Sequence, residues 1–443
     1  MKKIRFFFNL AREYLKKRYR LIILGIFLGI IFFLFIPNFW QKVPFFSKTK
    51  KIGVVGKYTL EEIPDEIQSL MSQGLTKISG DDEVIPALAE SFEVKSEGKE
   101  YVFKLKKDIK WTDGKPFVAK DVNYNFKDVQ IKIDNDYQIT FVLKDPFAPF
   151  PLAVSKPIFR KGLIGLGNYR IKKIQFNGQF VESIFLIPLD FPSHQNLIFK
   201  FYPTEDASKI ALKLGEITNL NDILSVDGIE NFANLKIESK TKFDRLVGLF
   251  FNTEKPYLED KLFRQALAYA IKKDRYSHRA LVSISPENWA YFEDVKPYDY
   301  DLNKAKSLLQ NSLNKTEPSE IKLTIVTVPQ LLNQAEAIRK DWQELGIKVE
   351  LGPFKPGETD FQVILAVQEM PSDPDQYSLW HSTSSNNITN LKSLRIDKLL
   401  EDGRINLNQE ERKKIYFDFQ KYLVEEAPVV FLYYPDVFSV TRK

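Results

Sequence analysis

Few residues of this chain have the types and the spacing that catalysis or metal binding requires. Its three histidines, His194, His278 and His381, lie far apart in the sequence, and neither the H-E-x-x-H pattern of zinc peptidases nor the G-x-S-x-G pattern of a serine nucleophile occurs. The carboxylates of Asp373 and Asp375 lack the glycine and the distal glutamate of a calcium loop. We therefore predict no catalytic residue, no metal site and no cofactor.

The residues best suited to contact a small molecule lie in one polar loop. Trp380 begins the run Trp-His-Ser-Thr-Ser-Ser-Asn-Asn, which offers hydroxyl and amide groups without a fixed acidic or basic side chain. An aromatic face gives a ligand contact area at a low entropy cost and tolerates varied partners. Packing of Trp380 against its own domain is the alternative. Asn252 has two interpretations as well, because an amide at the end of a strand can bond either a ligand or the backbone.

The composition excludes several classes of protein. The 443 residues include no cysteine, which excludes disulfides, thiolate metal sites, a cysteine nucleophile and a lipid-modified cysteine. Hydrophobic residues make up 44% and charged residues 28%, as in ordinary globular proteins. The net charge of the chain is +6, but the first 20 residues carry +7, from eight basic residues and one acidic residue, and the other 423 carry −1. We expect no nucleic-acid binding from such a body.

The amino-terminal part of the chain predicts a membrane anchor. The segment Leu21–Gln41 contains no charged residue. At 1.5 Å per residue, about 20 residues cross a hydrocarbon core of about 30 Å. The positive charge before this segment places the amino terminus in the cytoplasm, and no small-x-small cleavage site follows. We predict a basic cytoplasmic tail (1–20), a single transmembrane signal anchor (21–41) and a tether (42–51), with the rest of the chain outside the cell membrane.

From Ile52 onward, strand-like and helix-like patterns alternate, which predicts an α/β fold. A turn at 96–98 followed by alternating apolar residues over 101–105 predicts a β-hairpin. Leucine and alanine recur at helical spacing over 258–273. Asn408 with Glu411 forms the capping-box start of a last helix.

Seven segments in collinear order carry a family resemblance that covers nearly all of Ile52–Lys443. The most specific is W-x-D-G-K-P-F-x-A-x-D-V, from Trp111 to Val122, and later ones include D-P-D-Q-Y-S-L-W-H-S, from Asp373 to Ser382. The chain resembles the peptide- and nickel-type extracellular solute-binding proteins of ATP-binding-cassette importers. The resemblance implies a two-lobed, periplasmic-binding-protein-like (type II) α/β fold with the ligand between the lobes. Lobe I is expected over 52–250 and 428–443, and lobe II over 251–427.

The chain departs from the resembled family in two places. Only 13 residues separate Phe126 from Thr140, so we expect a reduced auxiliary subdomain. Relatives that bind a free peptide amino terminus have an aspartate four residues before the proline of the Asp-Pro motif, whereas Met370 occupies that position here. Either the neighbouring Glu369 replaces the aspartate or the chain does not bind an α-amino group. The predicted ligand-binding residues are Trp380, His381, Ser382, Asn252, Asn386, Glu369 and Tyr377.

These features predict a monomeric receptor rather than an enzyme. Anchored in the cell membrane, it would capture a small solute, an oligopeptide above all, and deliver it to the permease subunits of an importer. Nickel chelates, haem and oligosaccharides stay open as ligands. A sensor or adhesion module of the same fold is the first alternative function. A secreted hydrolase is the second, and the absence of a nucleophile motif argues against it.

Overall fold

The computed structural model describes Tyr19 and residues 49–79, 83–190, 195–312, 317–355, 357 and 359–443. The predicted transmembrane segment and nearly all of the predicted tail and tether lie outside these residues. Among the helices that the structure describes, none combines the length and the apolar composition needed to cross a membrane.

The chain forms two compact units, each assembled from separate segments. One unit comprises Met1–Glu62 and Asn168–Thr218, and the other comprises Ile63–Gly167 and Asn219–Lys443. The two units are the parts of the chain that are compact in themselves. Their boundaries differ from the predicted lobe boundaries, which stay a prediction. The two units are described in turn.

The first unit contains an ordered run of strands covered by one helix. The elements are β1 (Thr49–Val55), β8 (Tyr169–Asn177), β9 (Phe180–Pro188), β10 (Asn196–Tyr202) and α4 (Glu205–Leu214). The strand order is β1-β10-β9-β8, with β1 parallel to β10 and the other neighbours antiparallel. Thr204 starts α4 by accepting a hydrogen bond from the Ala207 amide (3.2 Å), and Gly215, with φ +77°, ends it.

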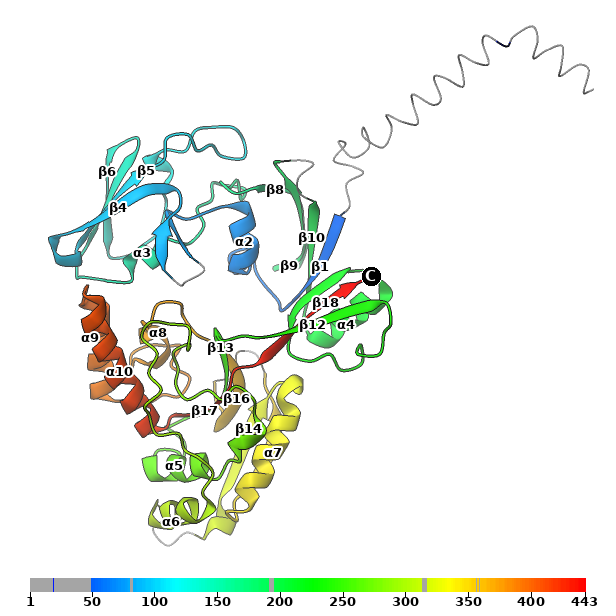
Figure 1. Cartoon of the computed structure of the whole chain (residues 1–443), viewed down its shortest axis with the longest axis vertical. Helices are drawn as coiled ribbons and strands as arrows, with labels where there is room; N and C mark the ends of the chain where they lie inside the picture. The colour runs from blue at the N-terminus through cyan, green and yellow to red at the C-terminus, as the bar shows by residue number, and fades with distance from the viewer. Residues whose placement is uncertain are drawn as a thin grey trace, which may run out of the picture. The chain divides into compact units, whose positions relative to one another are not determined.

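In the second unit, residues after Ile63 form a small antiparallel body. Its elements are α2 (Asp65–Met71), β2 (Thr76–Ile78), β3 (Val84–Pro86), β4 (Ala89–Lys95), β5 (Glu100–Leu105), β6 (Val129–Asn135), β7 (Gln138–Leu143) and α3 (Phe150–Ala153). Four strands lie in the order β4-β5-β7-β6, and the pairing of β4 with β5 confirms the predicted hairpin. Figure 1 shows β4, β5 and β6 close to α3. Trp111 is 2% exposed and packs edge-on against Phe117, so it is a core residue of this body.

A five-stranded sheet forms the largest core of the second unit. Its strands are β13 (Arg245–Phe251), β14 (Lys322–Thr327), β15 (Lys348–Pro353), β16 (Val363–Glu369) and β17 (Val429–Tyr433), in the order β15-β14-β16-β13-β17. The helices are α5 (Lys261–Tyr269), α6 (Leu302–Ser312), α7 (Leu332–Gln343), α8 (Tyr377–Trp380), α9 (Leu394–Ile405) and α10 (Gln409–Glu426). Gly346, with φ +86°, lets the chain reverse from α7 into β15, because other residues adopt this backbone conformation at a cost.

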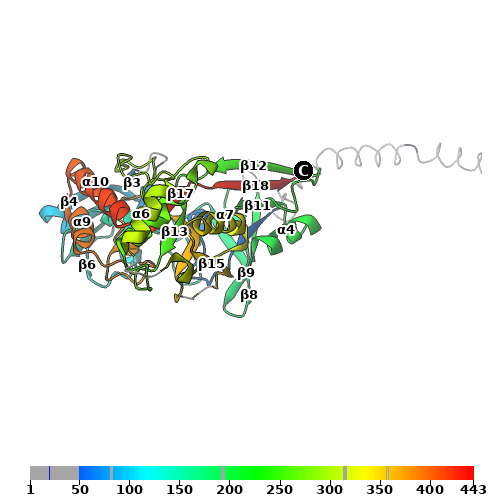
Figure 2. The ribbon, with the colours of Figure 1, turned by 90° about the horizontal axis from the view of Figure 1, so that it is seen from below.

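Two chain crossings connect the five-stranded sheet to the last three strands of the second unit. These strands are β11 (Asn219–Ile223), β12 (Leu235–Thr241) and β18 (Asp436–Arg442), in the order β12-β18-β11. The chain passes from β12 to β13 through 242–244 and from β17 to β18 through Tyr434 and Pro435. The Lys242 amide donates to the Pro435 carbonyl (2.9 Å), so the two crossings are bonded to each other. Figure 2 shows β12 and β18 side by side.

Candidate functional site

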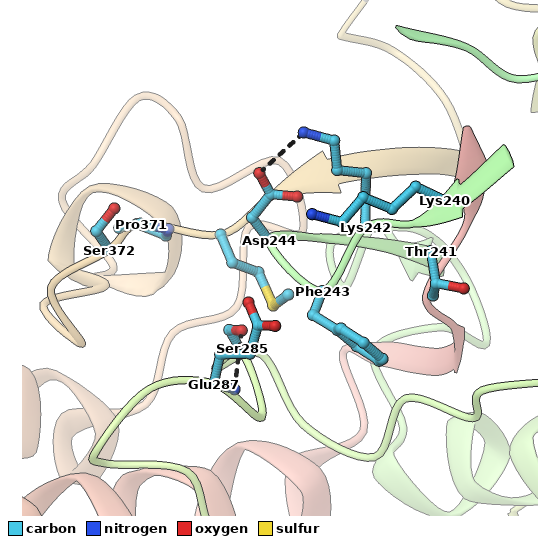
Figure 3. Close-up of a pocket in the computed structure, with 10 residues that line it drawn as sticks. Lys240, Thr241, Lys242, Phe243, Asp244, Ser285, Glu287, Pro371 and Ser372 are labelled. Carbon is cyan, nitrogen blue, oxygen red and sulfur yellow. Dashed lines mark hydrogen bonds and ion pairs between the residues drawn. The ribbon is translucent and has the colours of Figure 1, made fainter. Parts of the chain in front are cut away.

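A pocket of about 190 Å³ opens beside the first crossing (Figure 3). We call it the charged pocket. Three segments far apart in the sequence form it: the end of β12 with the crossing, a loop after α5, and the turn after β16. Its lining residues are Lys240, Thr241, Lys242, Phe243, Asp244, Ser285, Glu287, Met370, Pro371 and Ser372.

Strand pairing explains why the first and third segments meet. Strands β13 and β16 are antiparallel, with Arg245 opposite Glu369 at the end of both. The Met370 amide then donates to the Asp244 carbonyl (2.8 Å), which extends the pairing by one residue. Successive side chains of a strand point to opposite faces, so Glu369 and Met370 separate. Met370 is 7% exposed and lines the pocket, whereas the Glu369 side chain is 79% exposed and faces the Arg245 guanidinium (3.4 Å).

The charged pocket contains side chains of both signs in equal number. Lys240 and Lys242 bring ammonium groups, and Asp244 and Glu287 bring carboxylates. Lys242 Nζ and Asp244 Oδ2 are 3.8 Å apart, which is longer than a hydrogen bond, and the Asp244 side chain is 59% exposed. A pair this open contributes little to stability, and each partner can turn to a ligand group of opposite charge. The pocket therefore suits a ligand that has both an ammonium and a carboxylate group.

An aromatic cluster supports the pocket from the side of the crossings. The Phe243 ring contacts the rings of Tyr434 (5.3 Å between centroids) and His278 (6.0 Å), both edge-on. Phe243 belongs to the first crossing and Tyr434 to the second. The cluster therefore joins the two crossings next to the pocket, and Phe243 gives the pocket an aromatic wall.

Arg245 fixes the strand end beneath the pocket. Its Nη2 donates to Asp222 Oδ2 (2.6 Å), and its side chain is only 16% exposed. Burial lowers the pKa of this guanidinium, but the negative charges of Asp222, Glu369 and Asp244 outweigh burial and raise it. Arg245 therefore stays cationic and holds β11 against the start of β13.

The predicted residues of the polar loop lie elsewhere, around α8. Trp380 is 1% exposed, its ring stacks on Phe250 (6.4 Å), and its Nε1 donates to Gln376 Oε1 (2.9 Å). The half-buried Tyr377 stacks on the buried ring of His381 (3.9 Å). The structure thus surrounds Trp380 with its own side of the molecule, which is the alternative that the sequence left open.

The remaining predicted residues are held by other protein groups or are exposed. The Ser382 hydroxyl donates to Asp397 Oδ2 (2.6 Å). Asn252 is 4% exposed, and its Nδ2 donates to the Phe361 carbonyl (3.0 Å). Asn386 is exposed. Within the described part of the chain, none of the seven predicted residues lines the charged pocket. Their role in ligand binding stays a prediction.

The sequence analysis did not single out the residues that line the charged pocket, apart from Met370. One local signal was available: Lys240–Asp244 is a polar run with a single aromatic residue, placed immediately before an apolar stretch near the predicted end of the first part of lobe I. Ser285 and Glu287 had no comparable signal. Among the described residues, no group of three or more His, Cys, Asp or Glu side chains could hold a metal ion.

Comparison with known proteins shows which family this chain matches. The family model described as "Bacterial extracellular solute-binding proteins, family 5 Middle" matches residues 83–390. The dipeptide-binding protein of Escherichia coli is 26% identical over 458 aligned residues, covering 82% of this chain and 83% of the relative. The oligopeptide-binding protein AppA of Bacillus subtilis, solved with a nonapeptide, has a TM-score of 0.73 at 23% identity, covering 89% of this chain and 94% of that chain.

A second solved structure leads to the same fold. NikZ of Campylobacter jejuni, in complex with Ni(L-His), has a TM-score of 0.76 at 24% identity, with 89% of this chain and 94% of that chain covered. The fold is therefore the two-lobed α/β fold of solute-binding proteins. Members of the matched family are binding proteins, and the match covers more than half of the chain. This chain belongs to the bacterial extracellular solute-binding proteins of family 5, which serve ATP-binding-cassette importers.

Proposed function

We propose that this chain is a receptor for oligopeptides with free termini, which it delivers to the permease subunits of an importer. The observation that carries the proposal is the charged pocket, where two ammonium and two carboxylate side chains lie beside the crossings. A peptide with free termini has an ammonium group at one end and a carboxylate at the other, so its ends match the two kinds of charge in the pocket. Relatives named for dipeptides and oligopeptides support this ligand class.

The mechanism that we propose is closure of two lobes on the ligand. Open and closed arrangements exchange, and contacts that the ligand makes only in the closed form favour closure. The crossings are the segments that would absorb the rotation, because they are the short connections between sheets. The charged pocket lies against the first crossing, so a bound peptide would contact the segment that bends when the lobes close.

The amino-terminal segment has a role in this proposal. Leu21–Gln41 would anchor the chain as a single-pass membrane protein with a cytoplasmic amino terminus. Anchoring keeps a monomeric receptor close to its permease and raises the effective concentration of one for the other. It would take the place of a lipid-modified cysteine, which this sequence does not contain.

We also propose that the chain is not an enzyme. The Ser382 hydroxyl bonds the Asp397 carboxylate, and His381 Nδ1 bonds the Thr383 hydroxyl (2.8 Å). In a serine hydrolase the nucleophile bonds the histidine and the histidine bonds the acid. The arrangement around Ser382 does not have this order, so nothing there would activate the serine.

The test is native mass spectrometry of the full-length chain in detergent, followed by incubation with a tripeptide library. We expect a peptide to remain bound through purification, to exchange with added tripeptides and to be recovered intact. Hydrolysis of the library would favour the hydrolase. A bound nickel chelate or haem in place of peptide would contradict the ligand class and leave the receptor function standing.

A further inference from the structure

A second pocket adjoins the charged pocket at Ser372. It has a volume of about 290 Å³, and Ser372, which lies at the edge of the group drawn in Figure 3, lines both cavities. We call it the Trp289 pocket. A ligand long enough to pass Ser372 would reach from one cavity into the other. The lining residues of the Trp289 pocket are Glu83, Val84, Leu152, Trp289, Ser372, Asp373 and Gln409.

The segment between the two pockets is held in place by side chains. Asn288 Nδ2 donates to the Ser372 carbonyl (2.6 Å). Arg412, which is 7% exposed, binds both carboxylate oxygens of Asp373 (2.7 and 3.3 Å). These bonds give the wall that the pockets share a fixed position. They also neutralise the charge of Asp373.

The Trp289 pocket keeps one carboxylate that no cation in the described residues neutralises. Glu83 is exposed, and the ion pairs formed by the described residues do not include it. Gln409, also exposed, adds an amide. Val84 and Leu152 from the small antiparallel body and the half-buried ring of Trp289 add apolar and aromatic walls beside the polar Ser372 and Asp373. The pocket thus combines apolar surface with two carboxylates, of which Asp373 is paired with Arg412 and Glu83 is not paired with a described cation.

A long basic side chain has the complementary chemistry. The methylene groups of lysine or arginine pack on apolar surface while the charged end stays near water. The Arg412 guanidinium already lies over the Trp289 ring (5.4 Å to the centroid), so the indole gives the stem apolar contact and the Glu83 carboxylate attracts its charge. We infer that the Trp289 pocket is a side-chain subsite that selects peptides with a lysine or arginine next to the residue held in the charged pocket. This inference rests on the proposed function and narrows its substrate class.

Calorimetry of the full-length chain in detergent tests the inference. The reference peptide is trialanine. In one series lysine replaces each alanine in turn, and in a second series norleucine does so, because norleucine has the aliphatic stem of lysine without its charge. At one position we expect lysine to bind about tenfold tighter than norleucine, and we expect this preference to fall as salt is added. Glu83→Gln is expected to reduce the preference below twofold and to leave the norleucine peptide unchanged.

The control is Glu410→Gln, which removes an exposed carboxylate next to Gln409 that does not line the pocket, and it is expected to keep the full preference. Trp289→Ala is expected to weaken both peptides of the selective position. Equal affinity for lysine and norleucine at all positions of the unmodified chain would overturn the inference but not the proposed function. So would an equal loss for both peptides in Glu83→Gln. Absence of binding for every tripeptide would contradict the proposed function itself.

Discussion

Met370 places an uncharged side chain in the charged pocket, at the position where the resembled family has an aspartate. Relatives that bind a free amino terminus have an aspartate at this position, and the thioether of Met370, which lines the charged pocket, cannot neutralise a cation. Negative charge reaches the same pocket through Asp244 and Glu287 instead. Glu369, the predicted substitute, points to Arg245. Under the proposed function, other segments of the chain would therefore bind the ammonium group.

The first prediction concerns these carboxylates. Asp244→Asn and Glu287→Gln are each expected to weaken a peptide with a free amino terminus by roughly tenfold, because a bond to a charged partner contributes about 1.5 kcal/mol. An N-acetylated peptide is expected to bind both variants as it binds the unmodified chain. Glu369→Gln is the matched control, with less than a twofold change. If Glu369→Gln weakened binding and Asp244→Asn did not, the sequence prediction for Glu369 would be the better one.

The second prediction concerns Trp380. Because its ring is 1% exposed and stacks on Phe250, Trp380→Ala is expected to lower the free energy of unfolding by about 3–5 kcal/mol. Urea denaturation measures this loss. Leu394→Ala, which removes a side chain that is 89% exposed, is the control with little effect. Unchanged stability together with weaker peptide binding would instead place Trp380 in the ligand site.

Among the elements, α9 makes one of the contacts between the part of the chain built on the five-stranded sheet and the small antiparallel body. The Arg404 carbonyl near the end of α9 accepts from the Ala148 amide (2.7 Å). The Arg404 guanidinium lies between the rings of Tyr377 (4.3 Å) and Phe147 (4.8 Å), and its Nε donates to Asp375 Oδ2 (3.0 Å). One side chain thus links α8, α9 and the segment after β7.

The third prediction follows from the pKa of Asp375. Burial raises this pKa above its ordinary value of 3.8, and Arg404 opposes the rise. The folded state therefore holds the proton more tightly than the unfolded state. The Asp375 carboxyl therefore makes its whole contribution to the free energy of unfolding below pH 3.8. This contribution is lost as the pH rises through the pKa of the folded state. Arg404→Ala removes the opposing charge, so we expect a loss of about 2 kcal/mol at pH 7 and a smaller loss at pH 4.

Urea denaturation at the two pH values measures the difference. The double variant Arg404→Ala with Asp375→Asn has no carboxyl at this position. In the Asp375→Asn background, Arg404→Ala is therefore expected to lower the free energy of unfolding equally at pH 7 and pH 4. An Arg404→Ala loss that is equal at both pH values would show that the arginine acts through its ring contacts alone.

Local sequence signals predicted several elements well. The turn at 96–98 joins β4 to β5, and Asn408 caps α10 by accepting from the Glu411 amide (3.1 Å), both as expected. The capping box itself is not closed, because the Glu411 carboxylate accepts from Asn406 Nδ2 (2.8 Å). These features depend on neighbours in the chain. The polar loop was harder, because its polar groups bond each other: Asn387 Nδ2 donates to the carbonyls of Trp380, His381 and Leu391, which folds the loop over the indole. The polarity of Asn387 therefore reflects bonds within the loop, whereas Asn386 is exposed.

The charged pocket could not be predicted in the same way. Asp244, Glu287 and Met370 are brought together by strand register and by the path of a long loop, neither of which leaves a spacing in the sequence. The family resemblance predicted the class of protein and its two-lobed α/β fold. It could not identify the lining residues, because at Met370 the chain departs from the resembled pattern.

On the scale of the whole molecule, the proposal joins a receptor to a membrane anchor. The fourth prediction is that the full-length chain sediments with membranes after a carbonate wash. We expect a chain that begins at Thr49 to remain in the supernatant with unchanged peptide affinity, because the charged pocket is formed entirely by later residues. Recovery of the full-length chain in the supernatant would contradict the anchor and would leave the binding proposal untouched.

The central claim is that the charged pocket binds both ends of a zwitterionic ligand. Calorimetry with one tripeptide sequence in two forms, free at both termini or acetylated and amidated, tests it most directly. We predict saturable binding of the free form and at least hundredfold weaker binding of the blocked form by the full-length chain. Equal affinities for the two forms would contradict the claim.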